Sequence, residues 1–122
     1  MAKRVLLLGV LASVLDDARR QLPADVEFVS GSGVAEVRSA FRDADIDHVI
    51  MGGGLDLDAR AEMVREIFQL SDRATIHMKD QMSGPEGFLP FVRAVLGGLG
   101  DYEPKLSPKA FLRARHPGEA SP

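Results

Sequence analysis

The sequence predicts an α/β domain with three layers, α/β/α, built on a four-stranded parallel sheet in the order 2-1-3-4. Four short apolar runs alternate with four helical patterns between residues 3 and 99, which gives the order βαβαβαβα. Uninterrupted apolar runs are typical of strands that are covered on both faces. Strict alternation of strands and helices implies parallel strands joined by right-handed crossovers.

The predicted strands share one form, a short apolar run closed by glycine or by charged residues. They are RVLLLG (4–9), DVEFVSGSG (25–33), DHVIMGGG (47–54) and ATIHMKD (74–80). The fourth run is the weakest copy of the pattern. It contains His77 and Lys79, which are two positions apart and therefore share one face if the strand continues that far.

The first two predicted helices have recognisable start signals. SVLDDARRQL opens with Ser13 three residues before Asp16, which is the spacing of a capping box, and Pro23 stops it. VAEVRSAFRDA has one apolar face, and we expect Ser32 to cap it.

The third and fourth predicted helices differ in regularity. DARAEMVREIFQL carries an apolar stripe, and we expect Asp58 to cap it. PEGFLPFVRAVLGG contains Pro90, which an undisturbed helix does not accept in its interior. We therefore expect the regular part of this helix to begin near Pro90 and to end at the glycine pair.

Composition limits the classes of protein that this chain can represent. A length of 122 residues, 45% hydrophobic and 27% charged, is typical of one globular domain. A net charge of −3 argues against nucleic acid and against an anionic membrane as the main partner. The absence of cysteine excludes disulfides, thiolate catalysis and zinc-cysteine sites. No signal-peptide cleavage site follows the first apolar run, so we expect a cytoplasmic protein.

The composition changes after residue 99. We expect residues 1–99 to form the α/β domain and residues 100–122, which contain four prolines, to form a C-terminal extension. A short helix is expected near residues 108–115, followed by a flexible end. Phe111 and Leu112 of this extension need a surface to cover, either the sheet edge or a second subunit. We expect a homodimer with the fourth strand and residues 100–115 as its contact.

A candidate binding site follows from the strand order. Ligands of open parallel sheets bind beyond the carboxyl ends of the strands, in the crevice where the strand order reverses. That crevice lies between the loop after the first strand (9–13) and the loop after the third (52–57). The candidate ligand-binding residues are Gly9, Ser13, Gly52, Gly53, Gly54, His77 and Lys79.

Two interpretations of the glycine run GGG (52–54) stay open. It is either a tight strand-to-helix turn, with aspartates that cap the following helix, or a loop whose backbone N–H groups bind an anion. Asp56 and Asp58 could bind magnesium, but two carboxylates without a third ligand favour helix capping instead.

His77 and Lys79 also have two interpretations. They could bind an anion at the crevice, with His77 as an acid or base. Alternatively His77 is a hydrogen-bonded histidine at a strand end and Lys79 an exposed lysine on an edge strand. We favour this second interpretation, because nothing in the spacing requires a binding or catalytic role. Ser13, Ser30 and Ser32 lack a G-x-S-x-G context, and the sequence identifies no cofactor.

Two segments resemble the receiver domain of response regulators. DHVIMGGGLDLDARAEMVREI resembles the part in which a strand delivers the phosphoacceptor aspartate, and IHMKDQMSGPEGFLPFVRAVL resembles the closing part, in which a strand ends at a lysine. The resemblance implies a flavodoxin-like, Rossmann-like fold. Lys79 matches the lysine, but Gly52 stands at the phosphoacceptor position, Asp80 replaces the following proline, and GVLAS replaces the acidic pair that holds magnesium. One βα unit is missing before the fourth strand.

Two functions are compatible with these observations. The first is a receiver-like binding or protein-interaction module that is not phosphorylated on aspartate and is not an enzyme. The second is a protein, or an enzyme, that binds a small phosphate- or carboxylate-bearing ligand between the Gly9 loop and the Gly52–Gly54 loop.

Overall fold

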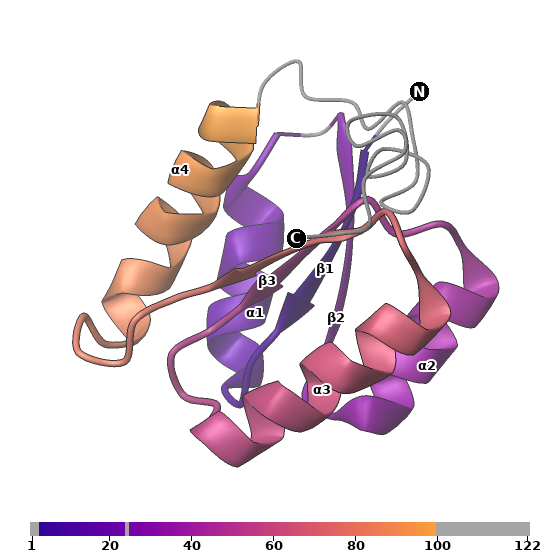
Figure 1. The fold of residues 1–122 in the computed structure, drawn as a ribbon. Coiled ribbons are helices and arrows are strands. Elements are labelled where there is room, and N and C mark those ends of the chain that lie inside the picture. Colours follow the sequence, from indigo (N-terminus) through magenta and orange to yellow (C-terminus); the bar gives the residue numbers. More distant parts are fainter. Residues whose placement is uncertain (1–2, 24, 100–122) are drawn as a thin grey trace, which may run out of the picture.

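The computed structural model describes residues 3–23 and 25–99, and the predicted C-terminal extension lies outside them. Strands and helices alternate along the chain, as Figure 1 shows. The elements are β1 (Lys3–Leu8), α1 (Ala12–Gln21), β2 (Val26–Gly31), α2 (Val34–Asp43), β3 (His48–Met51), α3 (Leu57–Leu70), β4 (Thr75–Met78), the 3₁₀ turn η1 (Pro85–Gly87) and α4 (Phe88–Leu99).

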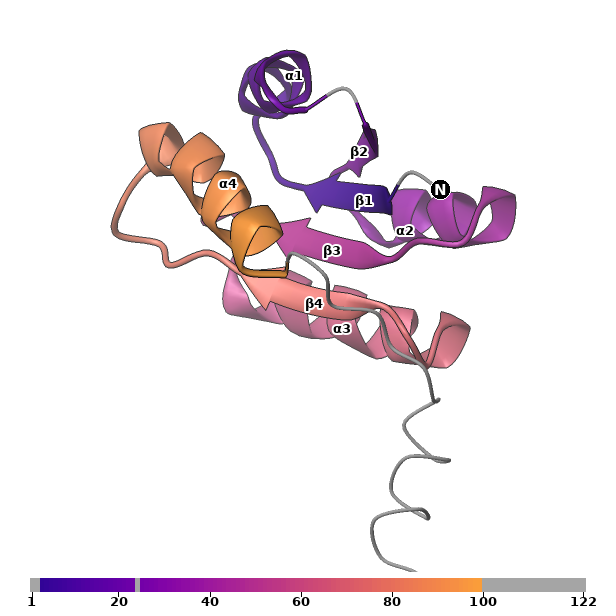
Figure 2. The same cartoon turned by 90° about the horizontal axis from the view of Figure 1, so that it is seen from above.

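The sheet confirms the predicted topology. Its four strands are all parallel and follow the order β2-β1-β3-β4. Helices α1 and α4 lie on one face and α2 and α3 on the other, which gives three layers (Figure 2). The fold is therefore an α/β fold of the flavodoxin-like type, with the strand order reversing between β1 and β3.

Each face of the sheet has its own hydrophobic core. Leu6 and Leu8 of β1 point toward α2 and α3, while Val5 and Leu7 point toward α1 and α4. All four residues of β3 are buried. Side chains alternate between the two faces of a strand, so a central strand that is covered on both sides needs an uninterrupted apolar run. This requirement explains why the runs in β1 and β3 were the clearest strand signals.

Three predicted helix caps are wrong. Helix α1 starts at Ala12 after Leu11, with no side-chain cap, so Ser13 lies inside the helix. Helix α2 follows Gly33, and the Ser32 backbone N–H and hydroxyl both donate to the Glu36 carboxylate. Helix α3 is capped by Asp56, which accepts from the Ala59 backbone N–H at 2.8 Å, and not by Asp58. Each start lies one or two residues from its predicted position, and two of the three observed caps, Leu11 and Gly33, make no side-chain hydrogen bond.

Helix α4 begins at Phe88, two residues before the expected start. The preceding turn η1 has Pro85 in its first positions and leads directly into the helix. Pro90 therefore lies in the first turn of α4, where its missing N–H removes no helical hydrogen bond. No helix in the described residues is long and apolar enough to cross a membrane.

Candidate functional site

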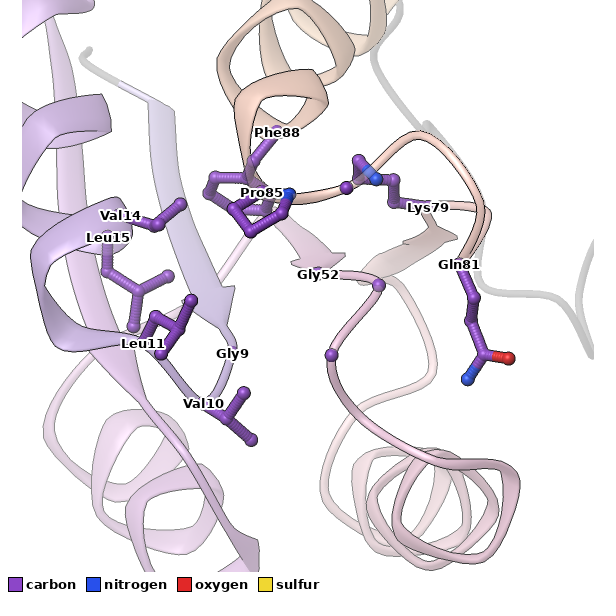
Figure 3. A pocket seen from close by; sticks show the side chains of 13 residues that line it. Gly9, Val10, Leu11, Val14, Leu15, Gly52, Lys79, Gln81, Pro85 and Phe88 are labelled. Atoms are coloured by element: carbon purple, nitrogen blue, oxygen red, sulfur yellow. The ribbon is translucent and has the colours of Figure 1, made fainter.

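A cavity of about 140 Å³ lies at the carboxyl ends of β1, β3 and β4, where the switch-point rule placed the crevice. Figure 3 shows its lining residues, with the start of α1 on one side and the start of α4 and the end of β4 on the other. The lining residues are Gly9, Val10, Leu11, Val14, Leu15, Gly52, Gly53, Gly54, Lys79, Gln81, Gly84, Pro85 and Phe88.

The structure brings together five of the seven candidate residues. Gly9, the glycine run 52–54 and Lys79 line the cavity, whereas Ser13 and His77 do not. Ser13 is exposed in the first turn of α1. His77 lies within β4, one residue before its end, and its side chain turns back along the sheet toward Thr75.

The glycine run 52–54 has ordinary backbone conformations, and its role is to leave room for neighbouring loops. Among the described residues only Gly84, with a φ of 72°, has a positive φ. A Cβ atom at Gly53 would lie 2.5 Å from the Asp80 carbonyl oxygen, and one at Gly54 would lie 2.6 Å from Val10 Cγ2. A Cβ atom at Gly52 would make only ordinary contacts, the closest at 3.5 Å. The run therefore lets the loop after β3 approach the loops after β1 and β4.

Two polar side chains donate hydrogen bonds to this loop. Neither of them was among the site residues predicted from the sequence. Arg60 in the first turn of α3 donates to the carbonyl oxygens of Gly52 and Leu55, at 3.0 Å in both cases. Gln81 Nε2 donates to the Leu55 carbonyl oxygen at 3.2 Å. Neither belongs to a recognisable motif, so only the fold could reveal that they reach the same loop.

Two backbone N–H groups at the cavity have no hydrogen-bond acceptor among the described residues. They belong to Gly53 and Gly54. The start of α1 has neither a side-chain cap nor an acidic residue in its first turn, whereas α3 has Asp56 as its cap. The positive end of the helix dipole at α1 therefore has no compensating group within the first turn of the helix itself.

Lys79 is the most unusual lining residue. The prediction of an exposed edge lysine is wrong, since its side chain is buried and only 1% of the residue is exposed. Its Nζ donates to the Asp80 carbonyl oxygen at 3.0 Å, and no carboxylate in the described residues forms an ion pair with it. A Cβ atom at Gly53 would lie 3.3 Å from Nζ, and one at Gly87 would lie 3.1 Å from Cε. The two glycines leave the space that this side chain occupies.

The neighbouring carboxylate, Asp80, is engaged elsewhere. It accepts hydrogen bonds from the backbone N–H of Ser83 at 2.8 Å and from the Ser83 hydroxyl at 3.0 Å. These two hydrogen bonds are the main reason that the pKa of Asp80 is lowered, and the charge of Lys79 contributes less. Asp80 therefore holds the loop after β4 and forms no ion pair with the Lys79 ammonium in the described residues, although it lies close enough for the two charges to interact.

His77 belongs to a polar chain along the sheet. Its Nε2 lies 2.9 Å from Thr75 Oγ1, which lies 2.6 Å from Nδ1 of the buried His48. Burial is the first cause that lowers the pKa of both rings, and for His48 the Lys3 charge adds to it. His48 starts β3 at the amino-terminal end of the sheet. His77 is thus hydrogen-bonded within the protein and stands apart from the cavity.

The described residues contain no group of three or more His, Cys, Asp or Glu side chains that could hold a metal ion. Asp56 serves as the helix cap, and Asp58 is exposed in the first turn of α3. What the cavity offers is one ammonium, free backbone N–H groups and apolar walls. Comparisons with family models, with curated proteins and with solved structures give no match for this chain.

Proposed function

We propose that this protein binds a small ligand with an anionic group in the cavity between the Gly9 loop and the Gly52–Gly54 loop. The observation that carries the proposal is the Lys79 ammonium, which is buried at the cavity with one neutral hydrogen-bond partner. An ammonium has three N–H donors, and two of these have no acceptor in the described chain.

A purely structural role explains this lysine poorly. A buried charge that forms no ion pair in the described residues is unfavourable, whereas an apolar side chain of similar length would fill the space between Gly53 and Gly87 without that loss. An anionic ligand would supply the missing acceptors. Proteins keep unfavourable buried polar groups mainly at functional sites, which supports a binding role for Lys79.

The backbone around the cavity supports the same conclusion. Free N–H groups at Gly53 and Gly54 and the uncapped start of α1 favour a negative charge nearby. Both groups come from the loops that meet at the strand-order reversal. Three independent features at one cavity therefore favour an anion, although no Walker or dinucleotide-binding glycine motif is present.

Thermal unfolding with a panel of small carboxylates, sugar phosphates and nucleotides tests the proposal. A ligand that binds the folded state raises Tm once its concentration exceeds Kd. We expect such a rise in the wild-type protein and its loss in Lys79→Met. Arg65→Met is the matched control, because it removes an exposed cation on α3 away from the cavity. No shift with any compound of the panel would contradict the proposal.

A second candidate is the receiver-like interaction module, a cytoplasmic homodimer. The observation that favours it is β4, which pairs with β3 on one side and has no strand on its other side within the described residues. Unpaired edges are common sites of association. Light scattering of the full chain should give a dimer mass. Incubation with a small phosphodonor and magnesium should leave the intact mass unchanged, because the resemblance to receiver domains assigns Gly52 to the phosphoacceptor position. A monomer, or a phosphoryl adduct, would contradict this candidate.

A further inference from the structure

We infer that the ligand is a small monocarboxylic acid with a compact apolar body, such as a short branched-chain acid or an aromatic acid. This inference rests on the proposed anion site and specifies the chemical class of its ligand. Three properties of the cavity carry it, namely its volume, its walls and its charge.

The volume of the cavity selects a small body. A volume of about 140 Å³ is close to the roughly 150 Å³ of an engineered apolar cavity that binds benzene in another protein. Pockets for drug-sized ligands and cofactors measure about 300–1,000 Å³. A nucleotide or an acyl-coenzyme A therefore cannot be enclosed here, whereas a phenyl ring or a branched C4–C5 chain fits.

The walls of the cavity select an apolar body. Val14 and Leu15 of α1 face the ring of Phe88 across the cavity, and Val10, Leu11 and Pro85 extend the apolar surface toward its mouth (Figure 3). Val10 and Leu11 are 56% and 48% exposed, although apolar side chains gain free energy when they are covered. A sugar would bring hydroxyl groups against these walls without partners for them.

The charges of the cavity select a monoanion. Lys79 is the one charged side chain among the lining residues in the described chain. Arg60, the arginine that reaches the glycine loop, is occupied by the carbonyl oxygens of Gly52 and Leu55. Asp80 and Asp56 add negative charge to the two adjacent loops. One ammonium balances one carboxylate, whereas a phosphate monoester carries close to two charges and would face nearby carboxylates without the arginine fork that phosphate sites often use.

These properties define one orientation for the acid. Its carboxylate lies at the Lys79 ammonium and the Gly53 and Gly54 N–H groups, and its apolar body lies between Leu15 and Phe88. The contact is non-covalent and needs no cofactor. The amide signals of Gly53 and Gly54 therefore report contact with the ligand carboxylate, separately from the residues that contact its apolar part.

Titration monitored by amide NMR of the full chain tests the inference with two matched series. One series is benzoate, benzamide and phenyl phosphate, and the other is 3-methylbutanoate, 3-methylbutanamide and 3-methylbutyl phosphate. We expect both acids to bind about 10- to 100-fold more tightly than their amides, which is the usual strength of a hydrogen bond to a charged group. We also expect them to bind more tightly than the phosphates and to shift the Gly53 and Gly54 signals.

Variants separate the two parts of the inference. Lys79→Met should remove the preference for the acids over the amides, while Arg65→Met should preserve it. Leu11→Ser should weaken all members of a series alike, because it trims the apolar wall at an exposed position. Tighter binding of the phosphates would overturn the inference and leave the proposed anion site intact. Equal binding of acid and amide, or shifts that avoid Gly53 and Gly54, would overturn both.

Discussion

At the amino-terminal end of the sheet, the Asp47 carboxylate accepts hydrogen bonds from the Arg4 backbone N–H at 2.9 Å and from the Arg73 guanidinium at 3.1 Å. At the carboxyl-terminal end, the Lys79 ammonium is more deeply buried and, within residues 3–23 and 25–99, donates only to the neighbouring carbonyl oxygen. The same four strands thus end in two different environments. At the amino-terminal end, the Asp47 carboxylate receives its hydrogen bonds from other residues of the described chain. At the carboxyl-terminal end, hydrogen-bond donors of Lys79, Gly53 and Gly54 face a cavity.

This difference separates the structural end of the sheet from its binding end. The backbone N–H of Asp47 donates to the Arg4 carbonyl and its own carbonyl accepts from Thr75 N–H, so Asp47 connects β1, β3 and β4. At the opposite end, the Gly52 backbone N–H donates to the Leu8 carbonyl and the Lys79 backbone N–H to the Met51 carbonyl, and the glycines allow the loops beyond the strands to approach each other. We therefore expect substitutions at the amino-terminal end to change stability alone, and substitutions at Lys79 to change binding as well.

The largest effect is expected from a substitution in the glycine run. Gly53→Ala places a Cβ atom against the Asp80 backbone carbonyl, which cannot rotate away, and should lower the free energy of unfolding by about 3 kcal/mol. Gly54→Ala should cost less, because the Val10 side chain can move, and Gly52→Ala should cost least. Urea unfolding of the three variants measures this order. If all three variants lost the same free energy of unfolding, steric contact with neighbouring atoms would not explain why glycine occupies these positions. Gly97→Ala in α4, with open space around it, is the neutral or stabilising control.

The second effect concerns the polar chain at the other end. Thr75→Val keeps the shape of the side chain but removes the hydroxyl between His48 and His77, which leaves the buried His48 Nδ1 without its partner. An unsatisfied buried polar group costs about 2 kcal/mol. Urea unfolding should show this loss, while the affinity for the cavity ligand stays the same. Thr75→Ser retains the hydroxyl and is the control. A change in ligand affinity in Thr75→Val would contradict the separation of the two ends.

A smaller effect of opposite sign is expected at Lys79. Lys79→Met should stabilise the ligand-free protein by about 1 kcal/mol, because it removes a buried charge that has one neutral partner. The same variant should lose anion binding. Differential scanning calorimetry without ligand gives the first quantity and titration the second. A Lys79→Met protein that is markedly less stable than wild type would show that the ammonium serves mainly to hold the loop after β4.

The smallest effect is expected from pH. Burial lowers the pKa of His48 and His77 in the folded protein from the ordinary value of 6.5. The unfolded chain therefore binds more protons than the folded one just below that pH, and stability should decrease as pH falls through about 6.5. Above this pH both states are neutral at these rings and the dependence should vanish. Unfolding at pH 7.5, 6.5 and 5.5 measures the slope, and His48→Asn should reduce it. If the slope of stability against pH were unchanged in His48→Asn, the pH dependence would come from other titratable groups.

The sequence was informative where the physical cause is local. The periodicity of apolar residues is set by 3.6 residues per helical turn and two per strand repeat, so the elements and the two-faced burial of β1 and β3 were predictable. The order 2-1-3-4 was predicted from the alternation of strands and helices and the handedness of their crossovers. The position of the crevice followed from that order. The helix caps were predicted less well, since Asp56 and Asp58, or Ser32 and Gly33, are near-equivalent choices in one dimension.

Only the tertiary structure decided what the glycine run and Lys79 do. From the sequence alone, Lys79 was an expected surface residue, because lysine at a strand end is usually solvated. It is buried because Gly53, from the loop after β3, and Gly87, from the turn before α4, both lack the side chain that would fill its place. Residues far apart in the chain create this space together. The sequence therefore determined the scaffold and the location of the site, and the packing of three loops determined which side chain gives the site its charge.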